Sequence, residues 1–252
     1  MFKQIPEVGK IWNDLSDDFH RTQMQYMDQS IHRLIANPEL RFAICEVIDN
    51  IVTNDSNEQF IYEVFLTDII SSDEDASILV QGKQGTGKST FLSMLWFDLL
   101  LAYSVNHGGI FPCYIDLHFY DTSTEEEAVE QLKSDLHILR TSIESLKPHR
   151  LFFILDGIDA YRRDLSSLQK TLFDHIDEYQ FRTICLGSAE NILHNLDQKQ
   201  GSNWLQLDYS MRLTVRSIPR KEKTKLHNVE RNISKIFANT QNVCVTLCSK
   251  MK

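Results

Sequence analysis

Apolar and polar positions follow two different rhythms along the chain, and the change comes near residue 71. Before that point, apolar residues recur at helical spacing. They fall into the groups 31–35, 42–51 and 60–70, with Asn37–Pro38 as a break after the first group. We therefore predict a helical N-terminal segment over residues 1–70. The polar run Ser-Ser-Asp-Glu-Asp at 71–75 predicts a linker and the first domain boundary.

After the linker, short apolar runs alternate with longer helical patterns. The runs predict strands at 77–81, 110–117, 151–155 and 183–187, with weaker candidates at 205–207 and 213–215. The patterns between them predict helices at 90–103, 124–147, 165–179 and 190–196. Thr124 and Glu127 form a capping box at the start of the longest helix. This alternation indicates an α/β domain over residues 71–218, with a parallel sheet of about five strands between two helical layers.

The C-terminal part, residues 219–252, is predicted to be a basic helix from Pro219 to about Ala238, followed by a tail. Its positive charges could touch nucleic acid or supply a charge to a neighbouring molecule's phosphate. A solvated helix face is the favoured interpretation, because the whole chain is acidic, with a net charge of −9. That charge also argues against loose binding to DNA or to an anionic membrane.

The bulk composition is that of an ordinary globular protein. Apolar residues make up 42% of the chain and charged residues 24%. The N-terminus carries no apolar stretch of signal-peptide length. The richest apolar run, 91–103, is interrupted by Ser93 and Asp98 and is too short to span a bilayer. These features predict a soluble, cytoplasmic protein.

A glycine-rich motif supplies the strongest chemical signal. The residues that follow the 77–81 strand fit the pattern G-x-x-x-x-G-K-[ST], the P-loop or Walker A motif, at every constrained position. Its backbone N–H groups, at the positive end of the next helix, are suited to phosphate oxygens. The chain is therefore predicted to bind ATP with Mg²⁺ through Gly82, Lys83, Gln84, Gly85, Thr86, Gly87, Lys88, Ser89 and the adjoining Thr90. Lys88 would reach the β- and γ-phosphates, and the Ser89 hydroxyl would bind the metal.

A second element is the apolar strand Leu-Phe-Phe-Ile-Leu that ends in Asp156. It resembles a Walker B strand, which delivers a carboxylate to the sheet edge where ligands bind. We assign Asp156 to Mg²⁺, through a coordinated water. Asp159 has two possible roles, either orienting the attacking water or capping the next helix. Asp116, at the end of the second strand, is a further candidate for the same edge.

These motifs together resemble the NACHT group of STAND nucleotide-driven switches. The resemblance rests on the P-loop sequence GKQGTGKS and on the pattern LFFILDGID at 151–159, and it covers roughly residues 75–218. It implies a five-stranded parallel sheet in which the 183–187 strand lies between the P-loop strand and the Asp156 strand. It also implies that Ser188 lies near the γ-phosphate.

The sequence departs from the NACHT pattern at three points. Ala160 stands where NACHT proteins usually carry an acidic residue, and Gly-Ser-Ala-Glu at 187–190 stands where they often carry an arginine. Both departures predict weak hydrolysis. NACHT proteins also continue into further modules, whereas this sequence ends at Lys252, so a truncated or fragmentary member is expected.

The leading hypothesis is an ATP- and Mg²⁺-binding switch whose hydrolysis is weak or depends on a partner. The partner would be another protein or a second copy, with Arg162, Arg163 or Arg220 as possible donors of charge. An active ATPase, with Asp159 or Asp156 organising water, and a small-molecule phosphotransferase remain alternatives. A GTPase is less favoured, because the Asn-Lys-x-Asp motif that reads guanine is missing after the P-loop.

Overall fold

A computed structural model describes most of the predicted α/β domain and parts of the N-terminal segment. The described residues are 17–25, 38–54, 59–72, 76–105, 109–120, 124–157, 166–179, 182–188, 210–217, 219, 221 and 224. Several predictions fall outside them: the helix at 190–196, the strand at 205–207 and nearly all of the C-terminal helix.

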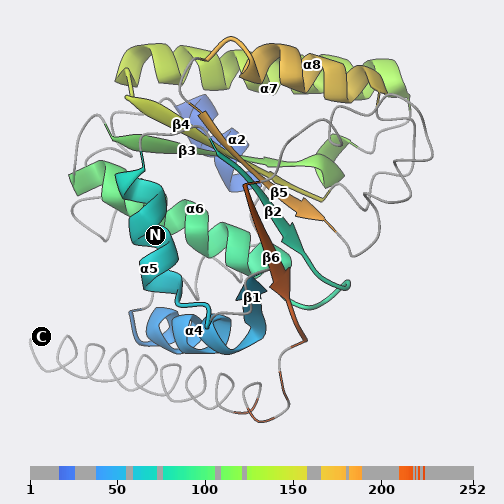
Figure 1. Ribbon diagram of the computed structural model, residues 1–252. Coiled ribbons are helices and arrows are strands. Elements are labelled where there is room, and N and C mark those ends of the chain that lie inside the picture. Colours follow the sequence, from blue (N-terminus) through green and yellow to red (C-terminus); the bar gives the residue numbers. More distant parts are fainter. Residues whose placement is uncertain are drawn as a thin grey trace, which may run out of the picture.

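A six-stranded sheet forms the middle of the molecule (Figure 1). Its strand order is β1-β6-β2-β5-β4-β3. The strands are β1 (Val52–Asn54), β2 (Ala76–Gln81), β3 (Ile110–Asp116), β4 (Arg150–Asp156), β5 (Arg182–Ser188) and β6 (Met211–Val215). The five strands from β6 to β3 run parallel, which confirms the predicted parallel sheet. β5 lies between β2 and β4, as the family resemblance implied.

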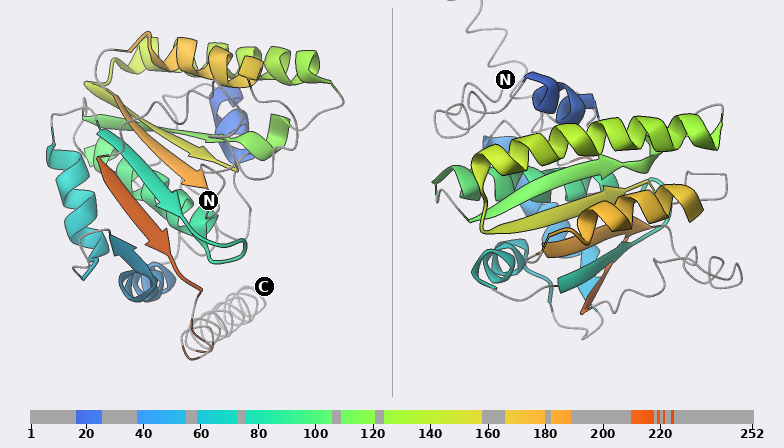
Figure 2. Two further views of the ribbon diagram at one scale, coloured as in Figure 1. Left: turned by 45° about the vertical axis from the view of Figure 1, so that its right-hand side comes forward. Right: turned by 90° about the horizontal axis from the view of Figure 1, so that it is seen from above.

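Helices cover both faces of this sheet (Figure 2). On one face lie α7 (Glu125–Leu146) and α8 (Ser166–Ile176), and on the other lie α6 (Lys88–Val105) and α5 (Tyr62–Ser71). The remaining helical elements are α2 (Asp17–Gln25), α4 (Pro38–Ile51) and the short 3-10 helix η2 (Leu117–Tyr120). Every residue of β4 is buried, as expected for a central parallel strand covered on both sides.

Two helices follow their sequence signals closely. α6 is buried nearly all round, which explains why its apolar residues show no single face. α7 begins with the predicted capping box, in which Thr124 and Glu127 each bond the other's backbone N–H. It ends at Leu146 and is capped by Lys147, which takes a left-handed conformation (φ 48°) directly before Pro148.

The N-terminal segment departs from its purely helical prediction at 52–54. These residues form β1, which pairs antiparallel with β6 at the sheet edge. Val52 and Thr53 are β-branched and suit a strand, but a three-residue strand is too short to show alternation. Its pairing partner also lies far away in the sequence. Phe42, grouped with the apolar positions of α4, is 65% exposed, whereas Ile44, Val47, Ile48 and Ile51 are buried.

None of the described helices is long and apolar enough to cross a membrane.

Candidate functional site

The glycine-rich loop connects the end of β2 to the start of α6. Gly85 and Gly87 have φ values of 76° and 104°, a region that residues with a Cβ rarely adopt. The amide of Phe91 donates to the carbonyl oxygen of Gly87 (2.9 Å), which joins the loop to the first turn of α6. The predicted strand–loop–helix arrangement of the P-loop is thus confirmed.

Lys88 folds back over the loop that precedes it. Its Nζ donates to the carbonyl oxygens of Gly82 (2.8 Å) and Lys83 (3.4 Å). Thr86 bonds the same Lys83 carbonyl through its hydroxyl (2.9 Å) and its amide (3.2 Å). The loop therefore presents a positive charge and a helix N-terminus together, the combination that binds phosphate. Gln84 and Gly85 are exposed, and Thr90 in the first turn of α6 is half-buried.

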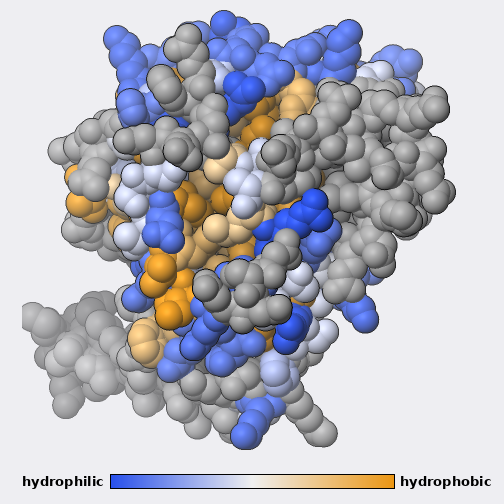
Figure 3. All heavy atoms as spheres, in the orientation of Figure 1, coloured by the Kyte–Doolittle hydropathy of each residue, from blue (hydrophilic) through white to orange (hydrophobic). Residues whose placement is uncertain are grey.

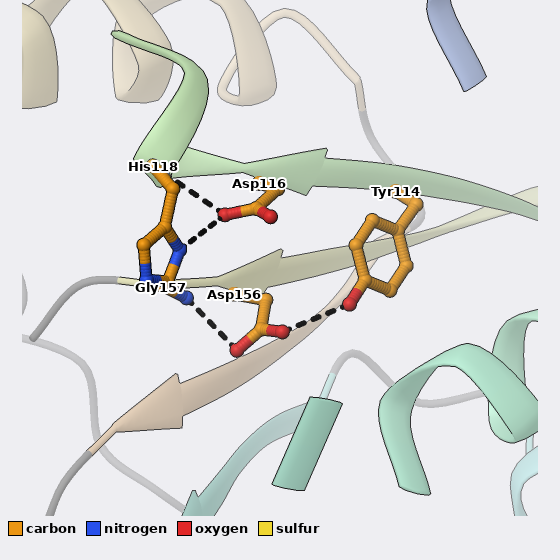
Figure 4. A network of polar contacts seen from close by, with 5 residues as sticks. All are labelled: Tyr114, Asp116, His118, Asp156 and Gly157. Atoms are coloured by element: carbon orange, nitrogen blue, oxygen red, sulfur yellow. Dashed lines mark hydrogen bonds and ion pairs between the residues drawn. The ribbon is translucent and has the colours of Figure 1, made fainter. Parts of the chain in front are cut away.

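Asp156 lies at the end of β4 and is 3% exposed (Figure 4). One carboxylate oxygen accepts from the Gly157 amide (2.8 Å) and the other from the Tyr114 hydroxyl (2.9 Å). The Ser89 hydroxyl lies close enough to this carboxyl group to lower its pKa. The two residues predicted to bind Mg²⁺ therefore lie near each other, although one belongs to α6 and the other to β4.

The electrostatic surroundings of Asp156 favour a nearby cation. Burial raises the pKa of its carboxyl group, and the charge of neighbouring Asp116 raises it further. The Ser89 hydroxyl and the hydrogen bonds from Tyr114 and Gly157 lower this pKa. Because a positive charge stabilises a carboxylate, a cation bound here would relieve the cost of burying this one.

The donor set also fits magnesium. Mg²⁺ prefers oxygen ligands, and at nucleotide sites it commonly takes one or two protein ligands together with phosphates and water. Ser89 and Asp156 offer a hydroxyl and a carboxylate at one point. Among the described residues, no group of three or more His, Cys, Asp and Glu side chains could hold a metal by itself. A site completed by phosphate oxygens is the arrangement these residues suit.

Asp116 lies at the same sheet edge, as predicted, because it pairs in register with Asp156. Two neighbours of Asp116 were missed by sequence reasoning. Tyr114 lies two residues earlier on β3, so its side chain shares a face with Asp116; that spacing could have indicated it. His118 follows in η2, and its ring bonds Asp116 (Nδ1 to Oδ1, 2.6 Å). No sequence signal distinguishes this histidine from an ordinary surface residue.

The other predicted site residues stand as follows. Ser188 ends β5 and pairs with Gln81, the last residue before the P-loop. Its proximity to a γ-phosphate remains a prediction. Asp159 lies outside the described residues, as do Arg162, Arg163 and Arg220.

A parallel sheet with this strand order, a P-loop between β2 and α6, and an aspartate at the end of β4 define a P-loop NTPase, a nucleotide-binding class. The model of the NACHT domain family matches residues 76–205. The chain belongs to the NACHT domain family. No curated protein sequence matches it.

Solved structures with a similar arrangement are distant in sequence. The ORC1 protein of Aeropyrum pernix in complex with DNA is 14% identical, with a TM-score of 0.44. The match covers 61% of this chain and 42% of that one. Drosophila ORC bound to GC-rich DNA and Cdc6 is 12% identical over 84% of this chain and 34% of that one (TM-score 0.43). C. elegans PCH-2 is 16% identical over 60% and 37% (TM-score 0.38). The chain thus spans less than half the length of each.

Proposed function

We propose that this NACHT module binds ATP with Mg²⁺ and works as a nucleotide-dependent switch whose hydrolysis is slow or depends on a partner. The observation that carries the proposal is the position of the Ser89 hydroxyl, close enough to the Asp156 carboxyl group to lower its pKa. The P-loop helix and the β4 carboxylate thus come together at the sheet edge where ligands of open α/β sheets bind.

In this proposal the P-loop amides and Lys88 bind the phosphates. The Lys88 ammonium exchanges its bonds to the Gly82 and Lys83 carbonyls for stronger, charge-assisted bonds to phosphate oxygens. Ser89 and Asp156 would hold Mg²⁺, with Tyr114 and Gly157 fixing the carboxylate. When bound, the metal supplies positive charge against the β- and γ-phosphate oxygens.

The switch would act through Phe91, which touches both the P-loop and the N-terminal segment. Its amide bonds Gly87 of the loop. Its ring packs edge-on against Tyr62 (5.9 Å between centroids) and lies 6.1 Å from Phe65 and 6.3 Å from Phe60. A change in the first turn of α6 on nucleotide binding would therefore reach α5 directly.

A buried polar network connects α6 with α4 and α5. Asp98 of α6 accepts a hydrogen bond from the Tyr62 hydroxyl (3.0 Å) and forms an ion pair with Arg41 of α4. Asp49 of α4 accepts from the Tyr62 amide (2.7 Å) at the start of α5. Such networks favour one defined arrangement of the elements they join. This supports a docked position for α4 and α5 that nucleotide can stabilise.

Slow hydrolysis is expected because two charged residues that would assist the reaction are missing from the sequence. Phosphoryl transfer depends on positive charge placed against the transition state. No arginine stands at 187–190, and Ala160 replaces an acidic residue after Asp159, the residue proposed to orient water. A protein partner or a second copy would supply the missing charge. Exposed apolar side chains around α5, such as Ile61 and Val64, offer a contact surface for it (Figure 3).

Thermal unfolding with ATP, ADP or GTP, each with and without Mg²⁺, tests the binding proposal. Ligands that bind the folded state stabilise it, by about 2.7 kcal/mol at a hundredfold excess over Kd. We expect ATP with Mg²⁺ to raise the unfolding temperature most and GTP to raise it less. Equal stabilisation by ATP and GTP would contradict the adenine assignment, and no stabilisation by any nucleotide would contradict the function.

Hydrogen exchange tests the switch. Amides of α4 and α5 should exchange more slowly when ATP and Mg²⁺ are present, because these helices pack on the P-loop helix. The Lys88→Ala variant is the control, and its exchange should respond only at nucleotide concentrations roughly 10- to 150-fold higher. Slower exchange confined to the P-loop and α6 in the wild-type protein would show that α4 and α5 are not part of a switch.

A further inference from the structure

Helix α2 lies against the outermost strand of the sheet, and the binding proposal gives it no role (Figure 2). β3 comes last in the strand order, so the N–H and C=O groups on its outer side have no strand of the described sheet to bond. At Tyr114, one side chain of α2 bonds both groups. Gln23 donates from Nε2 to the Tyr114 carbonyl oxygen (3.1 Å), and its Oε1 accepts from the Tyr114 N–H (3.0 Å). Gln23 thus takes the place of a peptide group from a further strand.

The same tyrosine reaches the proposed metal site with its side chain. Tyr114 is 1% exposed, and its hydroxyl donates to the Asp156 carboxylate (2.9 Å) (Figure 4). The backbone of Tyr114 is therefore bonded to α2 and its side chain to Asp156. These hydrogen bonds connect Gln23 with the carboxylate assigned to Mg²⁺.

The contact that holds α2 is small and mostly polar. Among the α2 side chains that the structure describes, the buried ones are Phe19, Thr22 and Gln23, which lie on one face of the helix. Of these three only Phe19 is apolar, and its ring lies 5.7 Å from that of Phe111 on β3. A cavity of about 10 Å³ remains between this face and α7. Elements with few buried apolar contacts separate at a low free-energy cost, so α2 can leave the sheet while the core stays folded.

The two amide bonds define where α2 docks. Burying a glutamine amide is unfavourable unless it is hydrogen-bonded, so Gln23 favours the one position in which it meets Tyr114. When α2 leaves, the outward-facing groups of Tyr114 lose the partner that holds them in place.

We propose that α2 is a strap that stabilises the Mg²⁺-binding arrangement of the site, with Gln23 as a positioning residue that acts through Tyr114. The inference rests on the proposed function. With α2 docked, the Tyr114 hydroxyl holds the Asp156 carboxylate in one orientation. With α2 released, Tyr114 is held less firmly and metal binding has to restore that orientation. Docking of α2 and Mg²⁺-dependent ATP binding are therefore coupled, and such coupling acts equally in both directions.

Hydrogen exchange in the wild-type protein tests this coupling. α2 has nine residues, and a helix this short is marginal by itself, so its amides exchange when it leaves the sheet. At saturating ATP, we expect α2 to exchange more slowly with Mg²⁺ than with EDTA. Tyr114→Phe keeps the backbone bonds to Gln23 but removes the hydroxyl, so α2 of this variant should not respond to Mg²⁺.

The possible failures are distinct. If the wild-type protein binds ATP and α2 exchanges equally with Mg²⁺ and with EDTA, this inference alone is overturned. A response to Mg²⁺ that persists in Tyr114→Phe would overturn the role of Tyr114. A wild-type protein that does not bind ATP would instead overturn the proposed function.

Titrations of ATP into variants separate positioning from general damage to the fold. Gln23→Ala should weaken binding with Mg²⁺ by about fivefold or more and leave binding in EDTA unchanged. Arg21→Ala, at a side chain of α2 that is 77% exposed, is the matched control and should alter neither. Adding Gln23→Ala to Tyr114→Phe should cause no further loss, because Gln23 acts through that hydroxyl. Unchanged binding in Gln23→Ala, equal losses with Mg²⁺ and EDTA, or fully additive losses in the double variant would reduce α2 to a structural contact.

Discussion

The Ser89 hydroxyl lies close enough to the Asp156 carboxyl group to lower its pKa, although Ser89 is in the first turn of α6 and Asp156 ends β4, which is two strands away from β2 in the sheet. The proximity follows from topology. β5 lies between β2 and β4, and the loop after β2 begins α6 at the same edge of the sheet where β4 ends. A hydroxyl and a carboxylate from distant parts of the sequence thus meet beside the phosphate-binding loop.

The first prediction separates the metal site from the phosphate site. Asp156→Asn should weaken ATP binding chiefly when Mg²⁺ is present, because the amide keeps the shape of the side chain but loses its charge. Titrations of wild type and variant, each with Mg²⁺ and with EDTA, measure this. Asp159→Asn is the comparison variant and should affect turnover more than binding. The reverse pattern would mean that the two aspartates have exchanged roles.

The second prediction uses the tight packing of Gly187 against the site. A Cβ at this position would lie 2.6 Å from Cδ1 of Leu92 and 2.9 Å from an Asp156 carboxylate oxygen. Gly187→Ala should therefore displace Asp156 and destabilise the protein by about 1–3 kcal/mol, as overpacking does. Denaturant unfolding measures the loss. Mg²⁺-dependent ATP affinity should fall while affinity in EDTA changes little, and unchanged Mg²⁺ dependence would show that Asp156 tolerates the crowding.

Local signals made the P-loop and Asp156 predictable. The loop's glycines, Lys88 and Ser89 stand in one contiguous motif, and Asp156 follows an uninterrupted apolar strand. The position of β5 between β2 and β4 came from family resemblance rather than from residue patterns. Tyr114 and His118 could not be assigned, because their places at the site depend on the register of β3 with β4. β1 was missed because its pairing with β6 is non-local and covers only three residues.

The third prediction concerns Asp98, which links α6 to the N-terminal helices. Burial raises its pKa from 3.8 to about 6, against the opposing effects of Arg41 and Tyr62. The unfolded chain therefore releases this proton at lower pH than the folded protein does, so stability falls as pH rises from about 4 to about 6. The loss is of the order of 3 kcal/mol.

Asp98→Asn removes this titration. Because the variant lacks this loss, its free energy of unfolding should increase relative to that of wild type by that amount between pH 4 and pH 7. Denaturant unfolding at both pH values checks it. A difference between the two proteins that stays constant with pH would show that Asp98 titrates normally.

The fourth prediction concerns rate. The chain should turn over ATP far below the range of about 1–100 s⁻¹ typical of kinases. In GTPases, an arginine supplied to the site is worth about 10³–10⁵ in rate, and none stands at 187–190 here. Phosphate release measured at low protein concentration should be slower than about once a minute. Release faster than about 1 s⁻¹ that Lys88→Ala abolishes would reveal a complete catalytic site within this chain.

The most direct measurement of the central claim is calorimetric titration of ATP with Mg²⁺ into the wild-type protein and Lys88→Ala. The ammonium of Lys88 should make charged hydrogen bonds to phosphate, each worth about 1.5–3 kcal/mol. The account predicts that the wild-type protein binds ATP and that the variant binds it roughly 10- to 150-fold more weakly, with the fold intact by circular dichroism. Equal affinity in the two proteins, or no binding to either, would contradict it.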